Sequence, residues 1–409
     1  MDATSDHGQA LLARQPIFDH QQRVIAYELL YGEDHHLDAM AQTAPEAESS
    51  SELLLHAYTS ISDKGEIKRV PAFIQVSPRM ILDGSVPALP AKHVVLCIRM
   101  TDPKDMDLLR AIHQMVKDGY RFALTDFEFS PEFDTALKLA KIVKVNARDK
   151  SAEQLTTLAS QLQPYKSTLL ASNISQFDTL EGCIECGYKL FQGSFLSKPK
   201  IVPGRKVSAN QMAMMQLIQE LQKTDTTPEK LEDLIIRDPI LTYKLLRIVN
   251  SATYSLVRQV ESVAEAVVLL GTEQVRKWAT LIALSANNDK PEELTRILLT
   301  RGHMCEMIAE TEKKPNPSSF FMVGMMSGLH AMLDIDQATL LQQLPLAEDI
   351  QTALTSGEGA MGTILHQVIA YEAGDWDMLP SNFDISLYEA AYRHSLKWTK
   401  ETMQAMYEE

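Results

Sequence analysis

Cys183 and Cys186 are separated by two residues, a spacing that can support two kinds of chemistry. A Cys-x-x-Cys pair at the start of a helix can be redox-active, and it can also supply half of a four-ligand zinc site. Here the pair ends a helical pattern, just before Gly187, and the four cysteines of the chain form no second pair of this kind. We therefore interpret both as small, half-buried side chains one helical turn apart, and we expect no metal site.

Three histidines of the C-terminal half, His303, His330 and His366, also lie in helical patterns. An imidazole beside a carboxylate in the sequence can hold a metal ion, because both groups are ligands of divalent metals. No adjacent His-Asp pair occurs between residues 203 and 409. Each of these histidines is therefore interpreted as a surface residue or as a hydrogen-bonded core residue.

The elements that must position such residues change in kind along the chain. Between residues 14 and 200, short apolar runs alternate with helical patterns, which favours crossover connections and a mostly parallel sheet. With about eight strands, a (β/α) barrel is the natural closure of that sheet. The expected strands are Arg14–Phe18, Val24–Tyr31, Ala72–Val76, Val94–Ile98, Phe122–Thr125, Ile142–Val145, Thr168–Ala171 and Lys189–Phe191.

Beyond Ser197–Lys206, a stretch with two prolines and four basic residues, the strand pattern stops and helical patterns follow. Asp238-Pro239 reads as a helix start, with a capping side chain before a proline at the first helical position. Gly324 and Gly328 have the small-x-x-x-small spacing of a helix contact rather than that of a phosphate-binding loop. We expect two domains, an α/β barrel over residues 1–202 and an all-helical domain over 203–409.

Segments of the first half resemble the EAL domain, a barrel family that hydrolyses cyclic di-GMP. The resemblance begins at Arg14–Asp19 and Val24–Leu30 and covers residues 12–202. It continues in the order of the family through Phe73–Pro78, Val95–Arg99, Ala123–Phe127, Ile142–Asn146, Leu169–Asn173 and Gln192–Gly193 with Pro199.

The second half resembles the HDOD domain, a helical relative of the HD hydrolases. The resemblance lies in Leu234–Tyr254 and in the apolar run Val263–Gly271. Together the two halves resemble bacterial EAL plus HDOD signalling proteins, the YuxH-like group. This likeness implies a TIM-like barrel of EAL type followed by an HDOD helical domain.

For active EAL enzymes, the resemblance implies hydrolysis by two divalent ions held by clustered oxygen ligands. Glu28, Asp126, Lys144 and Gln192 match positions of that site. Five metal-ligand positions are substituted, which leaves Glu28, Asp126 and Lys144 as the charged groups and favours a residual ion pair in the barrel mouth. The substituted positions are Gln75, Cys97, Thr125, Asn146 and Ser172.

The metal-binding pair of HD enzymes is replaced as well. Its His and Asp positions fall on Ser327 and Gly328, although His303 matches the place of the first histidine of that family. We therefore expect degenerate sites in both domains, no enzyme activity, no metal and no cofactor.

The charge of the whole chain limits its partners. There are 39 Lys and Arg against 54 Asp and Glu, a net charge of −15. That sign disfavours nucleic acid and anionic membranes, which attract cationic surfaces. The N-terminal residues contain no secretory signal and no apolar run is long enough to cross a bilayer, so we expect a cytoplasmic protein.

From these observations we expect a non-catalytic adaptor in a cyclic di-GMP-linked pathway, for example one controlling motility. It would act through contacts with signalling proteins and could form a homodimer. The alternative is a receptor that binds a cyclic dinucleotide or another nucleotide at the barrel mouth without metal. Residual phosphodiesterase activity is the outcome we least expect.

Overall fold

The structure is a computed structural model in which the chain divides into two compact units. One unit comprises Met1–Phe195 and Tyr371–Glu389, and the other comprises Leu196–Ala370 and Ala390–Glu409. The residues described are 12–31, 54–55, 58, 70–126, 129–148, 150–200, 209–223, 226–250, 259–285, 290–344, 346–380 and 382–407.

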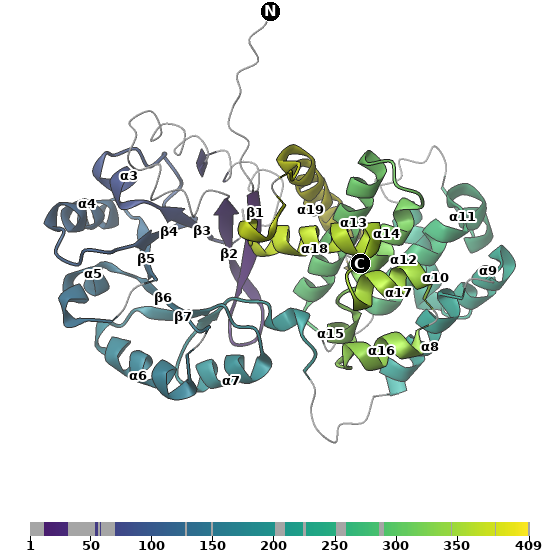
Figure 1. The fold of residues 1–409 in the computed structure, drawn as a ribbon, viewed down its shortest axis with the longest axis horizontal. Coiled ribbons are helices and arrows are strands. Elements are labelled where there is room, and N and C mark those ends of the chain that lie inside the picture. The colour runs from purple at the N-terminus through teal and green to yellow at the C-terminus, as the bar shows by residue number, and fades with distance from the viewer. Residues whose placement is uncertain are drawn as a thin grey trace, which may run out of the picture. The chain divides into compact units, whose positions relative to one another are not determined.

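The strands of the first unit form a closed barrel in the sequence order β1 to β8 (Figure 1). Strand β1 is antiparallel to both of its neighbours, β2 and β8, whereas the other neighbouring strands are parallel. The predicted barrel and its strands are thus confirmed. The strands are β1 (Leu12–Phe18), β2 (Val24–Tyr31), β3 (Ala72–Val76), β4 (Val94–Arg99), β5 (Arg121–Thr125), β6 (Ile142–Asn146), β7 (Thr168–Ser172) and β8 (Leu190–Phe191).

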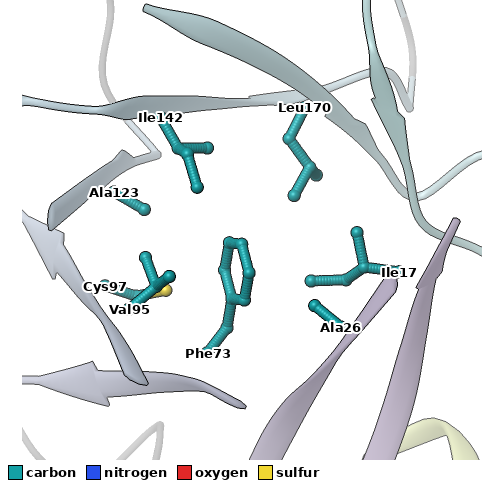
Figure 2. Close-up of a cluster of buried hydrophobic side chains, with 8 residues drawn as sticks. All are labelled: Ile17, Ala26, Phe73, Val95, Cys97, Ala123, Ile142 and Leu170. Carbon is teal, nitrogen blue, oxygen red and sulfur yellow. The ribbon is translucent and has the colours of Figure 1, made fainter. Parts of the chain in front are cut away.

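Apolar side chains fill the interior of the barrel. The ring of Phe73 lies at the centre of a buried cluster, and side chains from the surrounding strands point toward it (Figure 2). A small barrel of eight mostly parallel strands has room inside only for such side chains, so this part of the barrel is a core and not a pore. The other members of the cluster are Ile17, Ala26, Val95, Cys97, Ala123, Ile142 and Leu170.

Helices follow the strands on the outside of the barrel (Figure 1). Side-chain caps define where several of them begin: Asp105 accepts a hydrogen bond from the backbone of Leu108, and Ser151 and Gln154 form a capping box. Each cap satisfies backbone N–H groups that have no partner within the helix. These helices are α3 (Pro78–Leu82), α4 (Met106–Lys117), α5 (Asp134–Leu139), α6 (Ala152–Leu162) and α7 (Phe177–Glu185), with short 3₁₀ turns η2 (Pro131–Phe133), η3 (Gln163–Tyr165) and η4 (Phe195–Ser197).

The region after the barrel is helical, as predicted. Asp238 caps α10 through the backbone N–H groups of Ile240 and Leu241, with Pro239 at the first helical position. The helices are α8 (Ala209–Leu221), α9 (Pro228–Ile236), α10 (Pro239–Val249), α11 (Val263–Leu270), α12 (Thr272–Ser285), α13 (Glu292–Thr311), α14 (Pro317–Met326), α15 (Leu329–Leu333), α16 (Gln337–Gln343), α17 (Glu348–Thr355), α18 (Gly359–Ala373) and α19 (Ile385–Tyr407), with the 3₁₀ turn η5 (Trp376–Met378).

Two glycines, Gly324 within α14 and Gly328 just after it, pack closely on α13. A Cβ atom on Gly324 would lie 2.8 Å from the Cα of Gly302, and one on Gly328 would lie 2.3 Å from Leu298 Cδ2. Gly302 and Leu298 both belong to α13, so the predicted helix contact of Gly324 and Gly328 is confirmed.

One expectation falls on residues outside those described. The domain boundary between residues 202 and 203 lies in the stretch 201–208, which is outside the described residues, and it stays a prediction. Within the described part of the chain, no helix combines the length and the apolar character needed to span a bilayer.

Candidate active site

Three of the predicted site residues meet at the carboxyl-terminal end of the barrel strands. Lys144 Nζ lies 2.7 Å from Glu28 Oε1 and 2.6 Å from Glu28 Oε2. Gln192 Nε2 donates a hydrogen bond to Glu28 Oε2 over 2.5 Å. We call Glu28, Lys144 and Gln192 the Glu28 cluster.

Strands far apart in the sequence position this cluster. Glu28 lies on β2 opposite Gln15 of β1, Lys144 lies on β6, and Gln192 directly follows β8. In barrels of this architecture, catalytic residues lie at the carboxyl-terminal ends of the strands, where side chains from separate strands converge. The Glu28 cluster therefore lies where the fold normally places its chemistry.

Burial makes the ion pair of the cluster strong. The side chains of Glu28 and Lys144 are 8% and 16% exposed, and Gln192 is buried. Burial alone would lower the pKa of Lys144, but Glu28, with smaller contributions from Cys97 and Asp126, opposes it, so the pKa of Lys144 is raised. The ammonium group is therefore charged at neutral pH, and it holds the carboxylate in one orientation together with the Gln192 amide.

The thiol of Cys97 lies deeper in the barrel. Cys97 is fully buried on β4, and burial together with the charge of Glu28 raises the pKa of its thiol. A protonated thiol is a poor ligand, because the thiolate is the form that binds metal. Cys97 thus acts as a small core side chain (Figure 2).

Asp126 follows β5 in an unusual backbone conformation. Its φ is +46°, in the left-handed region, and its side chain is exposed. Left-handed residues other than glycine are uncommon and gather at functional sites. Asp126 is close enough to influence the pKa of Lys144, so the structure places it near the Glu28 cluster without a hydrogen bond to it among those described.

The substituted positions are occupied by neutral side chains at the ends of neighbouring strands. Thr125 is buried, and its Oγ1 has no hydrogen-bond partner among the described residues. Ser172 Oγ donates to the Val145 carbonyl, and Asn146 Oδ1 accepts from the backbone of Arg148. Gln75 pairs with Cys97 across β3 and β4.

The described residues do not fit the two-metal centre that the EAL resemblance implies. Both oxygens of the Glu28 carboxylate are bonded to Lys144, and one of them also accepts from Gln192. Nowhere in the described ranges do three or more His, Cys, Asp or Glu side chains gather as a metal-binding group. Two dications need more oxygen ligands than Glu28 and Asp126 provide.

In the helical unit, the Arg301 guanidinium contacts Ser327, one of the two residues predicted to replace the HD pair. Arg301 Nη1 donates a hydrogen bond to Ser327 Oγ over 3.0 Å, and Ser327 Oγ donates to the Gly324 carbonyl over 2.6 Å. Gly328 is the N-cap residue of α15 and packs against Leu298. Arg301 was not among the predicted site residues. It lies on the apolar face of α13 between Leu298 and Cys305, and a charged residue on such a face indicates a buried polar contact.

His303 lies close to these residues in the core of the helical unit. Its Nδ1 is 2.9 Å from Ser395 Oγ, and its ring stacks on Trp398 with the ring centroids 4.3 Å apart. Burial, reinforced by the charge of Lys277, lowers the pKa of His303 to about 3. The interpretation of His303 as a hydrogen-bonded core residue is therefore confirmed.

Lys277 forms a second buried ion pair that the sequence did not reveal. Its Nζ is 2.5 Å from Glu306 Oε2 and 3.8 Å from the centroid of the Phe321 ring. Burial lowers the pKa of Lys277 and raises that of Glu306. Lys277 lies among the apolar residues of α12, and its partner Glu306 lies on α13, so the pattern of α12 alone does not reveal this contact.

The remaining candidates behave as core and surface side chains. Cys183 is buried and its pKa is raised to about 11 by burial, which is the opposite of a reactive thiol. Cys186 Sγ lies 3.0 Å from Thr156 Oγ1. His330 is buried on α15, and its Nδ1 has no hydrogen-bond partner within the described part of the chain.

Comparison with known proteins identifies relatives of the whole chain. Residues 209–392 match the family model of the HDOD domain. The chain is 29% identical over 401 residues to the cyclic di-GMP phosphodiesterase CdgJ of Vibrio cholerae serotype O1, covering 95% of this chain and 92% of CdgJ. It is 25% identical to the uncharacterized protein YuxH of Bacillus subtilis strain 168, covering 97% of this chain and all of YuxH.

Solved structures are similar over about half of the chain. The PaMucR phosphodiesterase in complex with c-di-GMP gives a TM-score of 0.40 at 17% identity, covering 50% of this chain and 99% of that one. The EAL enzyme Bd1971 with cAMP and cyclic di-GMP bound gives 0.42 at 14% identity, covering 47% and 62%. The eight-stranded barrel and the helical region that matches the HDOD model confirm the expected fold.

The expectation of a non-catalytic adaptor acting through protein contacts is wrong. CdgJ matches nearly the whole chain, both halves included, and its name is that of a phosphodiesterase, which points to catalytic activity. The expectation counted carboxylates at aligned positions only. The sequence also has Glu128 and Asp149, which lie outside the described residues and were not part of that count.

Proposed function

We propose that this chain acts on cyclic di-GMP, binding the dinucleotide at the carboxyl-terminal mouth of the barrel and hydrolysing a phosphodiester bond there. The observation that carries this proposal is the match to CdgJ over 95% of the chain. The Glu28 cluster supports the location, because it joins a carboxylate, an ammonium group and an amide at the strand ends.

The chemistry available from the cluster follows from its groups. A carboxylate can accept a proton from an attacking water molecule, and an ammonium group can offset negative charge that develops on a phosphoryl oxygen. The Gln192 amide keeps Glu28 oriented. Because the described residues do not provide the ligands of two tightly held cations, we expect turnover to be slow.

We further propose that the HD position of the helical unit is not a second hydrolase site. The Arg301 guanidinium bonds to Ser327, and Leu298 fills the space beside Gly328. A fixed cation at that place disfavours a metal ion by repulsion, and a metal-ligating side chain at residue 328 would displace Leu298. Any hydrolysis by the full chain therefore depends on Glu28 and not on Arg301.

Calorimetric titration of the full chain with cyclic di-GMP, in buffers containing Mg²⁺, Mn²⁺ or EDTA, tests the ligand. We expect binding that is lost in Glu28→Gln. Glu153→Gln is the matched control, because Glu153 is an exposed carboxylate on α6 of the same unit.

The titrated samples are then analysed for linear dinucleotide by chromatography, which tests the reaction. Product from the wild-type chain and from Glu153→Gln, but not from Glu28→Gln, supports the proposal. Binding without product rejects hydrolysis and leaves cyclic di-GMP as the ligand. A chain that neither binds nor cleaves the dinucleotide overturns the proposal.

A further inference from the structure

Part of the region matched by the HDOD model belongs structurally to the barrel unit. Residues Tyr371–Glu389 lie within the matched range 209–392, yet they group with Met1–Phe195. We call Tyr371–Glu389 the strap. It contains the end of α18, the turn η5 and the start of α19.

The strap is bonded to the first barrel strand through one tyrosine. The Tyr371 hydroxyl accepts a hydrogen bond from the backbone N–H of Leu12 over 3.3 Å and donates one to the Leu12 carbonyl over 2.9 Å. Both residues are buried. A single hydroxyl thus satisfies both peptide groups of a residue that would otherwise be left with buried, unpaired polar atoms.

Among the described residues, this end of β1 has few other partners. Along its length β1 pairs with β2, but with β8 it pairs only at Phe18 among the described residues. The start of β1 therefore has no strand on its β8 side in the described ladder, and Tyr371 supplies the missing bonds at Leu12.

Aromatic packing holds Tyr371 in place. Its ring packs edge-on against Trp376, with the centroids 5.3 Å apart, and lies 6.2 Å from Tyr388 and 6.4 Å from Phe383. Phe383 and Tyr388 are themselves 4.2 Å apart. Such ring pairs add to the stabilisation from burial and have preferred geometries, so the hydroxyl has a defined position.

A second contact reaches the strand that carries Glu28. Gly374 has a φ of +73°, and a Cβ atom there would lie 2.6 Å from Leu30 Cδ1. Leu30 is two residues after Glu28 on β2, so the two side chains point to the same face of the strand. The strap thus contacts β1 at Leu12 and β2 at Leu30.

From these contacts we infer that Tyr371 is a positioning residue for Glu28. It fixes the start of the β1–β2 pair, and that pair sets where the Glu28 carboxylate meets Lys144 and Gln192. The consequence for cyclic di-GMP binding rests on the proposed function, whereas the positioning itself does not. The helices α18 and α19 continue from the strap into the second unit, so the HDOD-matched region takes part in building the barrel site.

The test uses the full chain with Tyr371→Phe, which removes the hydroxyl and keeps the ring. The matched control is Tyr188→Phe, because Tyr188 is equally buried in the barrel unit and its hydroxyl donates to the Leu155 carbonyl over 3.3 Å, away from Glu28. Without ligand, we expect Tyr371→Phe to speed amide exchange in the β1–β2 pair by roughly tenfold or more, since both hydrogen bonds of the hydroxyl to Leu12 are lost.

The Lys144 ammonium resonance in nitrogen-15 NMR provides the readout that general destabilisation would not move. This signal should shift in Tyr371→Phe and stay in place in Tyr188→Phe when the two variants have equal thermal stability. Equal exchange of β1–β2 in both variants, or an unmoved Lys144 signal, would overturn the inference.

Ligand affinity separates this inference from the proposed function. We expect Tyr371→Phe to weaken cyclic di-GMP binding by roughly threefold or more, and Tyr188→Phe to leave it within roughly twofold. If the wild-type chain binds no cyclic di-GMP, the proposed function fails, and the ligand-free exchange and Lys144 signals still decide the role of Tyr371.

Discussion

At the scale of single residues, the site is organised by buried charges and the groups that compensate them. Glu28 is buried and bonds to Lys144 and Gln192, and Lys277 is buried against Glu306 and an aromatic ring. Removing one member of such a pair leaves the other unpaired in a low-dielectric environment, whereas replacing both with neutral groups avoids that cost. The free energy of unfolding therefore differs between single and double variants of a buried pair, whereas for an exposed pair this difference is small.

We predict that Lys144→Met lowers the free energy of unfolding by about 3 kcal/mol, because Glu28 loses its counter-charge inside the barrel. The double variant Lys144→Met with Glu28→Gln should recover most of this loss. Urea denaturation of the three proteins measures it. A double variant as unstable as the single one would show that the pair does not set the stability.

His303 gives the helical unit a pH dependence. Its pKa in the unfolded chain is near 6.5 and in the folded protein about 3, because burial and Lys277 oppose protonation. Between these values the unfolded chain binds more protons, so stability is full above about pH 6.5 and falls as the pH falls. From about pH 6.5 to 5 we expect a loss of about 2 kcal/mol, which His303→Phe should abolish.

Chemical denaturation at a series of pH values checks this expectation, with His113→Phe as the control because His113 is an exposed histidine on α4. The control should keep the slope of the wild-type chain. A slope that survives in His303→Phe would assign the pH dependence to other groups.

At the scale of elements, the sequence predicted the strands well and the contacts between distant elements poorly. Val24–Tyr31 and Ala72–Val76 were predicted to the residue, because alternating or continuous apolar runs are bounded by polar turns. Periodicity reports which face of an element is buried but not what buries it. The bond between Tyr371 and Leu12, 359 residues apart, therefore left no trace in the pattern.

The sequence predicted part of the candidate site and missed the rest. The resemblance placed Glu28, Lys144 and Gln192 on strands β2 and β6 and after β8, and the closed barrel brings them together. The assignment of these residues and of the substituted positions to a former metal site stays a prediction. Arg301 and Lys277 were missed because their partners come from other helices.

The contact of α13 with α14 gives a prediction at this scale. Gly324→Ala should lower the free energy of unfolding by about 1–3 kcal/mol, because the added Cβ meets backbone atoms of Arg301 and Gly302 that cannot rotate away. Gly182→Ala, on α7, meets nothing within 4 Å and should stabilise the chain by up to about 1 kcal/mol. Thermal unfolding compares the two, and a neutral Gly324→Ala would contradict the close packing.

At the scale of the whole molecule, the two regions matched in the sequence do not coincide with the two compact units. The HDOD match ends at residue 392, but the strap within it packs with the barrel strands. CdgJ and YuxH both match across the two halves. The strap, which lies within the HDOD match, contacts the first two barrel strands at Leu12 and Leu30.

The measurement that tests the central claim most directly is a single-turnover assay, with the full chain in excess over labelled cyclic di-GMP and Mg²⁺ or Mn²⁺ present. We predict slow conversion to the linear dinucleotide by the wild-type chain and none by Glu28→Gln. Excess protein makes even slow hydrolysis visible, because every bound dinucleotide is followed to completion. A wild-type chain that leaves the label unchanged, or a Glu28→Gln chain that converts it equally fast, would contradict the account.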